Sequence, residues 1–153
     1  MSIYKKEVNM SILLGEMAED IKLLAPNLGL ETNIAENLKV QGDRDLLAQV
    51  LQNLISNAIK YNLPNGWIKI QAYQEKKTVV IRVSNASLDI PASDREYLFY
   101  RFYRGDKVRS RQIEGIGLGL SLAREITRAH NGNLIIEPAI LSQTTFLLTL
   151  LIK

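Results

Sequence analysis

Three polar residues recur at helical spacing inside an otherwise apolar stretch. In QNLISNAIKYN, residues 52–62, Asn53 and Asn57 lie four residues apart and Lys60 follows three residues later. An α-helix turns by about 100° per residue, so these side chains fall on one narrow stripe. Amide oxygens and an ammonium group are suited to Mg²⁺ and to phosphate. The pattern predicts a helix with one face in the core and a polar row facing a cleft.

A glycine-rich stretch supplies a second part of such a site. GIGLGL contains Gly115, Gly117 and Gly119 directly before an expected helix. Glycines let the backbone approach a ligand closely, and a helix start offers unpaired N–H groups to phosphate oxygens. A flexible hinge before a helix would look the same, and the amides and lysine of the first stretch could instead contact loop backbone and solvent. The two patterns together favour a nucleotide site more than either does alone.

Hydrophobic periodicity outlines the elements that must position these residues. Apolar residues recur at helical spacing over 10–24, and Asp43 is the expected N-cap of a helix over 44–61. Residues 67–74 and 78–85 alternate in hydrophobicity, which predicts an antiparallel hairpin. The other expected elements are strands at 30–34 and 38–40, a short helix opened by Ser93, a helix over 118–132 closed by Gly132 as its C′ residue, and strands at 134–138 and 144–152. This order favours an α/β (α+β) two-layer sandwich, a mixed sheet packed on about three helices.

Composition narrows the class of protein. The chain has 153 residues, 46% of them hydrophobic, which suits one domain with its own core. It has no cysteine, and His130 is its single histidine, so neither a thiolate nor a multi-histidine metal centre is expected. A net charge of +3 is too small to indicate nucleic acid. No apolar run reaches the roughly 20 residues that span a bilayer, which predicts a cytoplasmic domain, whether or not its parent is anchored in a membrane.

Three motifs, taken together, indicate a family. The stretch GDRDLLAQVLQNLISNAIKYN, residues 42–62, resembles the N box of sensor histidine kinases. LFYRFYRGD, residues 98–106, resembles their F box, and GIGLGLSLAREI, residues 115–126, their G2 box. The chain is therefore identified as similar, over nearly its whole length, to the catalytic, ATP-binding domain of these kinases. The same superfamily includes the ATPase domains of DNA gyrase and MutL.

The resemblance implies a Bergerat-type ATP-binding fold, protein-histidine kinase activity, and ATP with Mg²⁺ as cofactors. Asn57 would coordinate Mg²⁺, Asn53 would support the metal or the phosphates, and Lys60 would contact the phosphates. Arg104 would reach the γ-phosphate, which completes a catalytic set with Asn57 and Lys60. The residues expected to bind the nucleotide are Asn53, Asn57, Lys60, Tyr61, Asn85, Ile90, Gly115, Gly117, Leu118, Gly119, Leu120 and Thr145.

The resemblance also implies what surrounds the domain. A lid would span roughly residues 103–119, with Phe99 and Phe102 at its base. Residues 1–9 would be the tail of a linker and residues 10–153 the catalytic domain. The phosphoacceptor histidine would lie on a separate dimerisation domain, through which the parent forms a homodimer, and a response regulator receiver domain would be the further partner.

One motif departs from the family pattern. The usual Asp-x-Gly-x-Gly of the G1 box is NASLD here, so Asn85 replaces the aspartate expected to accept from the adenine amino group. A carboxamide accepts from that amine and also donates to ring N1, so recognition would be weakened rather than lost. Ser87 and Asp89 replace the two glycines, and such positions often need φ > 0, which Asp tolerates better than Ser. These changes leave an alternative open, a degenerate kinase domain that binds nucleotide weakly or not at all and acts by docking.

The single histidine is expected to be structural. His130 follows the G2 helix in the sequence AHNG, where it would cap the end of that helix. A phosphorylated residue is not expected at that place in the family pattern.

Overall fold

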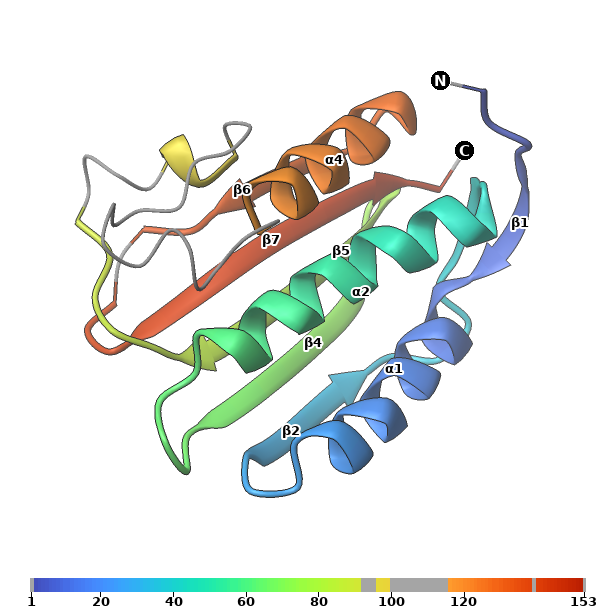
Figure 1. Cartoon of the computed structure of the whole chain (residues 1–153). Coiled ribbons are helices and arrows are strands. Elements are labelled where there is room, and N and C mark those ends of the chain that lie inside the picture. The colour runs from blue at the N-terminus through green and yellow to red at the C-terminus, as the bar shows by residue number, and fades with distance from the viewer. Residues whose placement is uncertain (1, 92–95, 100–115, 139, 153) are drawn as a thin grey trace.

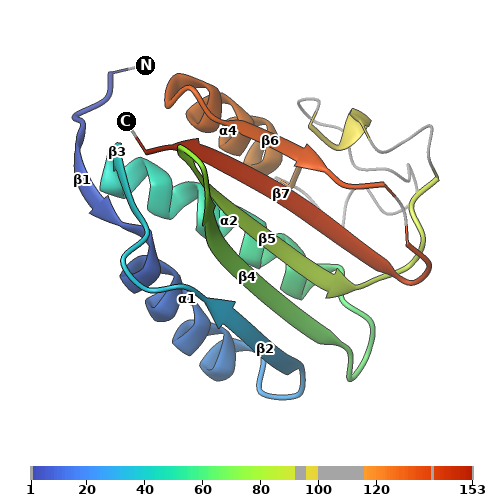
Figure 2. The ribbon, with the colours of Figure 1, turned by 180° about the vertical axis from the view of Figure 1, so that it is seen from behind.

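The architecture is a two-layer sandwich. A computed structural model describes residues 2–91, 96–99, 116–138 and 140–152. Three helices cover one face of a five-stranded sheet (Figure 1), and the view from behind shows the sheet's other face without a covering helix from this part of the chain (Figure 2). The helices are α1 (Met10–Leu24), α2 (Arg44–Lys60) and α4 (Ile116–Ala129), with one 3₁₀ turn, η1 (Glu96–Phe99). The strands are β1 (Lys6–Asn9), β2 (Gly29–Ile34), β3 (Lys39–Gly42), β4 (Trp67–Glu75), β5 (Thr78–Ala86), β6 (Asn133–Ile136) and β7 (Gln143–Leu151).

The main sheet is mixed, so the predicted fold class is confirmed. Its strand order is β2-β4-β5-β7-β6, with β2 parallel to β4 and the other neighbours antiparallel. The expected hairpin of β4 and β5 is present and pairs Ile70 with Val83 and Ile68 with Asn85. Since side chains alternate along a strand, these four residues share the face that the helices cover.

The core lies between that face and the helices. The predicted apolar side of α2 is buried as expected, with Val50, Leu51 and Leu54 wholly enclosed and Ile59 half-buried. Burying one such leucine stabilises the fold by roughly 1.5–3 kcal/mol relative to leaving it exposed. The core of the sandwich therefore fixes α2 in rotation about its own axis, and with it the stripe of polar residues on its flank.

Residues 6–9 belong to the folded domain, which differs from the expected linker boundary at residue 9. They form β1 and pair antiparallel with β3, and Val8 is buried in the core. Asn9 is the N-cap of α1, because its Oδ1 accepts a hydrogen bond from the Ile12 backbone at 3.2 Å. A short strand with one buried side chain gives little periodicity, so the sequence alone did not indicate β1.

Asp43 caps α2 as predicted. Its Oδ1 accepts from the Leu46 backbone at 3.3 Å and its Oδ2 from the Tyr4 backbone at 3.2 Å. The hydrogen bond from Tyr4, followed by that from Leu46, holds the pKa of the Asp43 carboxyl below its ordinary value of 3.8. The N-terminal segment and the start of α2 are thus joined through one carboxylate.

The end of α4 differs by one residue from the prediction. Asn131, with φ of 59°, takes the left-handed C′ position expected for Gly132. Its backbone N–H donates to Arg128 at 2.9 Å, and that of Gly132 donates to Thr127 at 2.9 Å, the bonding pattern of a Schellman motif. Gly132 is required for another reason, because an added Cβ would lie 2.3 Å from the Thr149 carbonyl oxygen.

His130 joins the end of α4 to the start of α2, which confirms its structural role. The ring is buried, with Nδ1 donating to the Ile126 carbonyl at 2.8 Å and Nε2 accepting from the Asp43 backbone at 3.0 Å. Gly42 leaves room for the ring, since an added Cβ there would lie 2.8 Å from His130 Cδ2. The imidazole is therefore held as the neutral tautomer with its proton on Nδ1.

We expect His130→Ala to lower the free energy of unfolding by about 2–3 kcal/mol, because it leaves the Asp43 N–H without its acceptor and opens a cavity. Urea unfolding at neutral pH measures the change. Glu125→Ala, on the exposed side of the same helix, is the control and should stay within about 0.5 kcal/mol of the parent. Equal stability of the His130 variant and the parent would show that the bridge between α4 and α2 does not stabilise the fold.

Candidate active site

The candidate residues gather at one end of the sandwich. Figure 1 shows the last turns of α2, the end of β5 and the beginning of β7 at the same end, with the start of α4 above them. Asn53, Asn57 and Lys60 come from α2, Asn85 from β5 and Gly119 from α4. The two stretches first singled out in the sequence therefore do meet in space.

Asn53 connects α2 to α4. Its Nδ2 donates to the Gly119 carbonyl at 3.0 Å, and this bond spans 66 residues of sequence. An added Cβ on Gly119 would make only ordinary contact, at 3.7 Å, with the Asn53 side chain, so Asn53 does not require the glycine. The Asn53 amide thus contacts backbone, which was the alternative to a ligand-binding role expected for residues 52–62. This contact fixes the first turns of α4 beside the polar stripe of α2.

Asn57, one turn further along, is nearly buried and chemically available. Only 8% of its surface is exposed. Its backbone carbonyl oxygen accepts a hydrogen bond from the Tyr61 backbone N–H at 3.1 Å. Its side-chain carboxamide, by contrast, makes no hydrogen bond with any residue that the structure describes. Lys60 lies beyond it at the exposed end of the stripe. An enclosed amide next to an exposed ammonium is an arrangement suited to a metal-bound polyphosphate.

Asn62 anchors the end of α2, a role that the sequence analysis did not assign. Its Nδ2 donates to the Ala58 carbonyl at 3.1 Å and to the Trp67 carbonyl at 2.9 Å, so it ties the last turn of the helix to the first residue of β4. Gly66 passes so close that an added Cβ would lie 2.0 Å from Asn62 Oδ1. The signal was present as an amide directly after a helix and before a Pro-Asn-Gly turn.

Asn85, which the resemblance assigns to reading the base, is the second-last residue of β5 and lies on the helix-covered face of the sheet. Only 2% of its surface is exposed. Its Nδ2 donates to the Ala86 carbonyl at 2.8 Å, which fixes the orientation of the amide because only the nitrogen can donate. Its Oδ1 accepts no hydrogen bond from the described part of the chain. The oxygen is thereby the atom available to accept from an amine, and one N–H of the amide is already in use.

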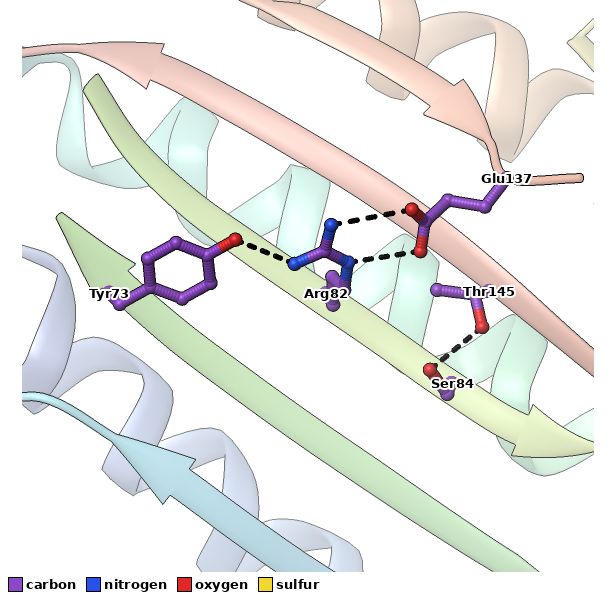
Figure 3. Close-up of polar contacts among 5 residues, drawn as sticks. All are labelled: Tyr73, Arg82, Ser84, Glu137 and Thr145. Carbon is purple, nitrogen blue, oxygen red and sulfur yellow. Dashed lines mark hydrogen bonds and ion pairs between the residues drawn. The ribbon is translucent and has the colours of Figure 1, made fainter. Parts of the chain in front are cut away.

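Thr144, and not Thr145, accompanies Asn85. The register of β5 and β7 pairs Asn85 with Thr144, whereas Thr145 is opposite Ser84 on the other face of the sheet. The hydroxyls of Ser84 and Thr145 lie 2.8 Å apart there (Figure 3). Two-residue alternation from the buried Phe146 would have identified Thr144 as the residue on the helix side.

The outer face of the sheet near Thr145 carries a network of polar side chains. Arg82 donates to both Glu137 oxygens, at 3.0 and 3.4 Å, and to the Tyr73 hydroxyl at 2.7 Å (Figure 3). The hydrogen bonds that Arg82 donates to Glu137, and then the one to Tyr73, raise the pKa of its guanidinium. This network stabilises the uncovered side of the sheet, and its side-chain bonds involve none of the predicted site residues that the structure describes.

The remaining expected residues fall into three groups. Leu120 is buried in the core, and Ile90 is half-buried after the end of β5. Gly117 and Leu118 lie in the first turn of α4. Arg104, Gly115, Phe102 and Ser93 are outside the described residues.

Phe99, expected at the base of the lid, is packed from two sides. Its ring meets that of Phe146 edge-on, with centroids 5.9 Å apart, and the Arg124 guanidinium carbon lies 4.2 Å from its centroid. Arg124 comes from α4 and Phe146 from β7, so η1 is fixed to both layers. For this ring the packing role that the resemblance implied is confirmed.

The described residues contain no cluster of three or more His, Cys, Asp or Glu side chains that could hold a metal ion. In the same part of the chain, no helix is both long and apolar enough to cross a membrane.

Comparison with known proteins gives a consistent result. Residues 42–153 match the family described as histidine kinase-, DNA gyrase B-, and HSP90-like ATPase. The chain is 42% identical over 100 residues to the sensor histidine kinase WalK of Bacillus subtilis, covering 64% of this chain and 16% of WalK. It is 35% identical over 130 residues to the sensor-like histidine kinase SenX3 of Mycobacterium bovis, covering 84% of this chain and 32% of SenX3. The chain thus spans less than a third of the length of these two curated relatives.

Solved structures agree with the sequence relatives. The catalytic domain of histidine kinase ThkA superposes with a TM-score of 0.85 at 28% identity, covering 97% of this chain and 96% of that one. ThkA in complex with the response regulator protein TrrA gives a TM-score of 0.82 at 26% identity, covering 99% of this chain and 42% of that one.

We expect Asn85→Asp to lower the free energy of unfolding by about 1–3 kcal/mol, because a carboxylate cannot donate to the Ala86 carbonyl and would be buried beside it. Urea unfolding at pH 7 measures this. Asn33→Asp, at an exposed position of β2, is the matched control and should change stability by less than about 0.5 kcal/mol. An Asn85 variant as stable as the parent would contradict the amide orientation described above.

Proposed function

From its membership of the family of histidine kinase-, DNA gyrase B- and HSP90-like ATPases, as a catalytic ATP-binding domain of the sensor histidine kinase type, we propose a function for this chain. It binds Mg·ATP between α2 and α4. It then donates the γ-phosphoryl group to a histidine of a partner domain. The observation that carries this proposal is the Asn57 carboxamide, enclosed at 8% exposure and not bonded within the described chain. A carboxamide that no described residue bonds has its oxygen available to coordinate a metal ion and its nitrogen available to donate to a ligand.

The residues present fit a magnesium–nucleotide complex. Amide oxygen is a normal Mg²⁺ ligand, and Mg²⁺ usually completes its coordination with water and phosphate oxygens. The metal, when bound, would offset the charge of the triphosphate. Asn57 would hold it, and Lys60 would contact the phosphates as a point charge. The Oδ1 of Asn53 would also contact the metal or the phosphates, while its Nδ2 donates to the Gly119 carbonyl and so holds α4 in place.

The base is proposed to lie toward the end of β5. Asn85 Oδ1 would accept from the adenine amino group, and Thr144 lies opposite it on β7. Tyr61 and Ile90 would line the nucleotide, with Gly115, Gly117 and Leu118 on its phosphate side. Thr145 and Leu120 are left out of this proposal, because the first lies on the other face of the sheet and the second lies in the core.

The transfer itself would depend on positioning and charge. A ring nitrogen of the acceptor histidine attacks the γ-phosphorus, the bond to the β–γ bridging oxygen breaks, and ADP leaves. Lys60 and Arg104 would stabilise the charge that develops on the phosphoryl oxygens. His130 is unsuited as the acceptor, since both ring nitrogens are hydrogen-bonded inside the fold.

The partners follow from the same role. The acceptor histidine would lie on the dimerisation domain of the parent protein, and the phosphoryl group would pass to a response regulator receiver domain. The ThkA–TrrA complex, whose kinase superposes on this chain, supports the second partner. Because ATP and receiver domains are cytoplasmic, we place the domain in the cytoplasm.

We expect Asn57→Ala to raise the Kd for Mg·ATP by at least about tenfold and to remove most of the dependence on Mg²⁺, because the metal loses its protein ligand. Calorimetric titrations with and without Mg²⁺ measure both effects. Gln52→Ala, an exposed amide on the same helix, is the matched control and should bind as the parent does. The metal assignment is wrong if Asn57→Ala keeps the affinity and the Mg²⁺ dependence of the parent.

Transfer is tested separately. With radiolabelled ATP, the isolated chain should incorporate no stable label, whereas a separately produced dimerisation domain of the same parent should become labelled in its presence. Stable label on His130 would contradict the acceptor assignment. Binding of ATP without any transfer to the dimerisation domain would contradict the kinase proposal.

A further inference from the structure

The segment that replaces the family's glycine-containing G1 box is fastened to the rest of the molecule. It runs from Asn85 to Asp89, across the end of β5, and meets the turn of residues 140–143 that leads into β7. Neither Ser87 nor Asp89 has a positive φ, so the strain that a glycine position can impose is absent. The two side chains make contacts that glycine could not make.

Ser87 is bonded through both its main chain and its side chain. Its backbone N–H donates to the Ser142 carbonyl at 3.0 Å. Its hydroxyl lies 2.7 Å from that of Thr144, and the residue is buried. Because Thr144 pairs with Asn85 across the two strands, the Ser87 hydroxyl restrains the threonine beside the residue proposed to read the base.

Asp89 completes the attachment from the far side of the turn. Its Oδ1 accepts from the Ser142 backbone at 2.7 Å. Ser142 has φ of 63° and is the third residue of a turn closed by a 3.1 Å bond from the Gln143 N–H to the Ile140 carbonyl. A left-handed serine is unfavourable by itself, so a charge-assisted bond to its N–H stabilises the turn in this conformation.

We propose that Ser87 and Asp89 are positioning residues, which fasten segment 85–89 to the turn before β7 and thereby hold Asn85 and Thr144 in the geometry that selects adenine. The proposal rests on the proposed function and adds to it the part of the site that determines the base. Restraining a loop before the ligand arrives removes an entropy loss from binding. Two side-chain hydrogen bonds thus take the place of the two glycines, and together with the backbone bond from Ser87 to Ser142 they restrain the base side of the site.

The test compares two nucleotides that differ only in the base. Adenosine and inosine triphosphates carry the same phosphates, but inosine has a carbonyl where adenine has its amine. The proteins are the parent chain, Ser87→Ala, Asp89→Ala, the conservative Asp89→Asn, and Leu88→Ala. Leu88 lies between the two anchors with 61% of its surface exposed, which makes it the matched control. Calorimetry with Mg²⁺ gives each Kd, and amide hydrogen exchange at Ser142 reports the attachment directly.

We expect Ser87→Ala and Asp89→Ala to weaken ATP about fivefold while the inosine nucleotide changes by less than about twofold, since only base selection is loosened. Exchange at Ser142 should become about tenfold faster in Asp89→Ala. Asp89→Asn keeps an oxygen acceptor and should restore both values, and Leu88→Ala should match the parent.

Other results overturn the proposal. If the ratio of the two affinities is unchanged in Ser87→Ala and Asp89→Ala, or if both nucleotides weaken equally, the two residues do not position the base side. A parent chain that binds Mg·ATP but does not prefer it over the inosine nucleotide also overturns the proposal and leaves the proposed function intact. A parent that binds neither nucleotide overturns both.

Discussion

The arrangement of this domain depends on how α2 is held. Its apolar side is enclosed by the sheet, with Val50, Leu51 and Leu54 fully buried, so the helix cannot rotate without exposing leucine. It is also fixed along its length by side-chain bonds to three other parts of the chain. His130 accepts from Asp43 at its start, Asn53 donates to α4 in its middle, and Asn62 donates to β4 at its end. Because α2 is fixed in this way, the side chains of its polar stripe face one defined side of the helix. The proposed nucleotide site depends on that orientation.

Alternation along the strands imposes the second constraint. In β5 and β7, neighbouring residues face opposite sides of the sheet, so a shift by one residue moves a side chain from the proposed site to the outer face. Asn85 and Thr144 lie on the helix side, while Ser84 and Thr145 bond to each other on the other side. The expected assignment of Thr145 came from the family resemblance, which does not by itself indicate the face. Counting from the buried Phe146 does indicate it, and that count is available in the sequence.

The parts of the fold that depend on local periodicity were predictable, and the parts that depend on distant contacts were not. Helices α1 and α2, the β4–β5 hairpin and the Asp43 cap follow from spacing and residue type within one element. By contrast, β1 exists because it pairs with β3, and Gly132 is needed because the Thr149 backbone passes close to it. Likewise, nothing near His130 in the sequence indicates that its ring accepts from Asp43, 87 residues away. In the candidate site, Asn57 was identified by its spacing, whereas the bond from Asn53 to Gly119 needed the folded structure.

The glycines that the family usually has after β5 and the residues found here solve the same geometric problem in different ways. A glycine allows a tight path for the backbone but leaves the segment flexible in the unbound state. Serine and aspartate accept an ordinary backbone path, with no positive φ at either position, and use their side chains to restrain the neighbouring turn. The residue of the neighbouring turn with a positive φ is Ser142, and its N–H donates to the Asp89 carboxylate, which stabilises that conformation. Departure from a motif is therefore weak grounds for lost function when the replacing side chains form new bonds at the same place.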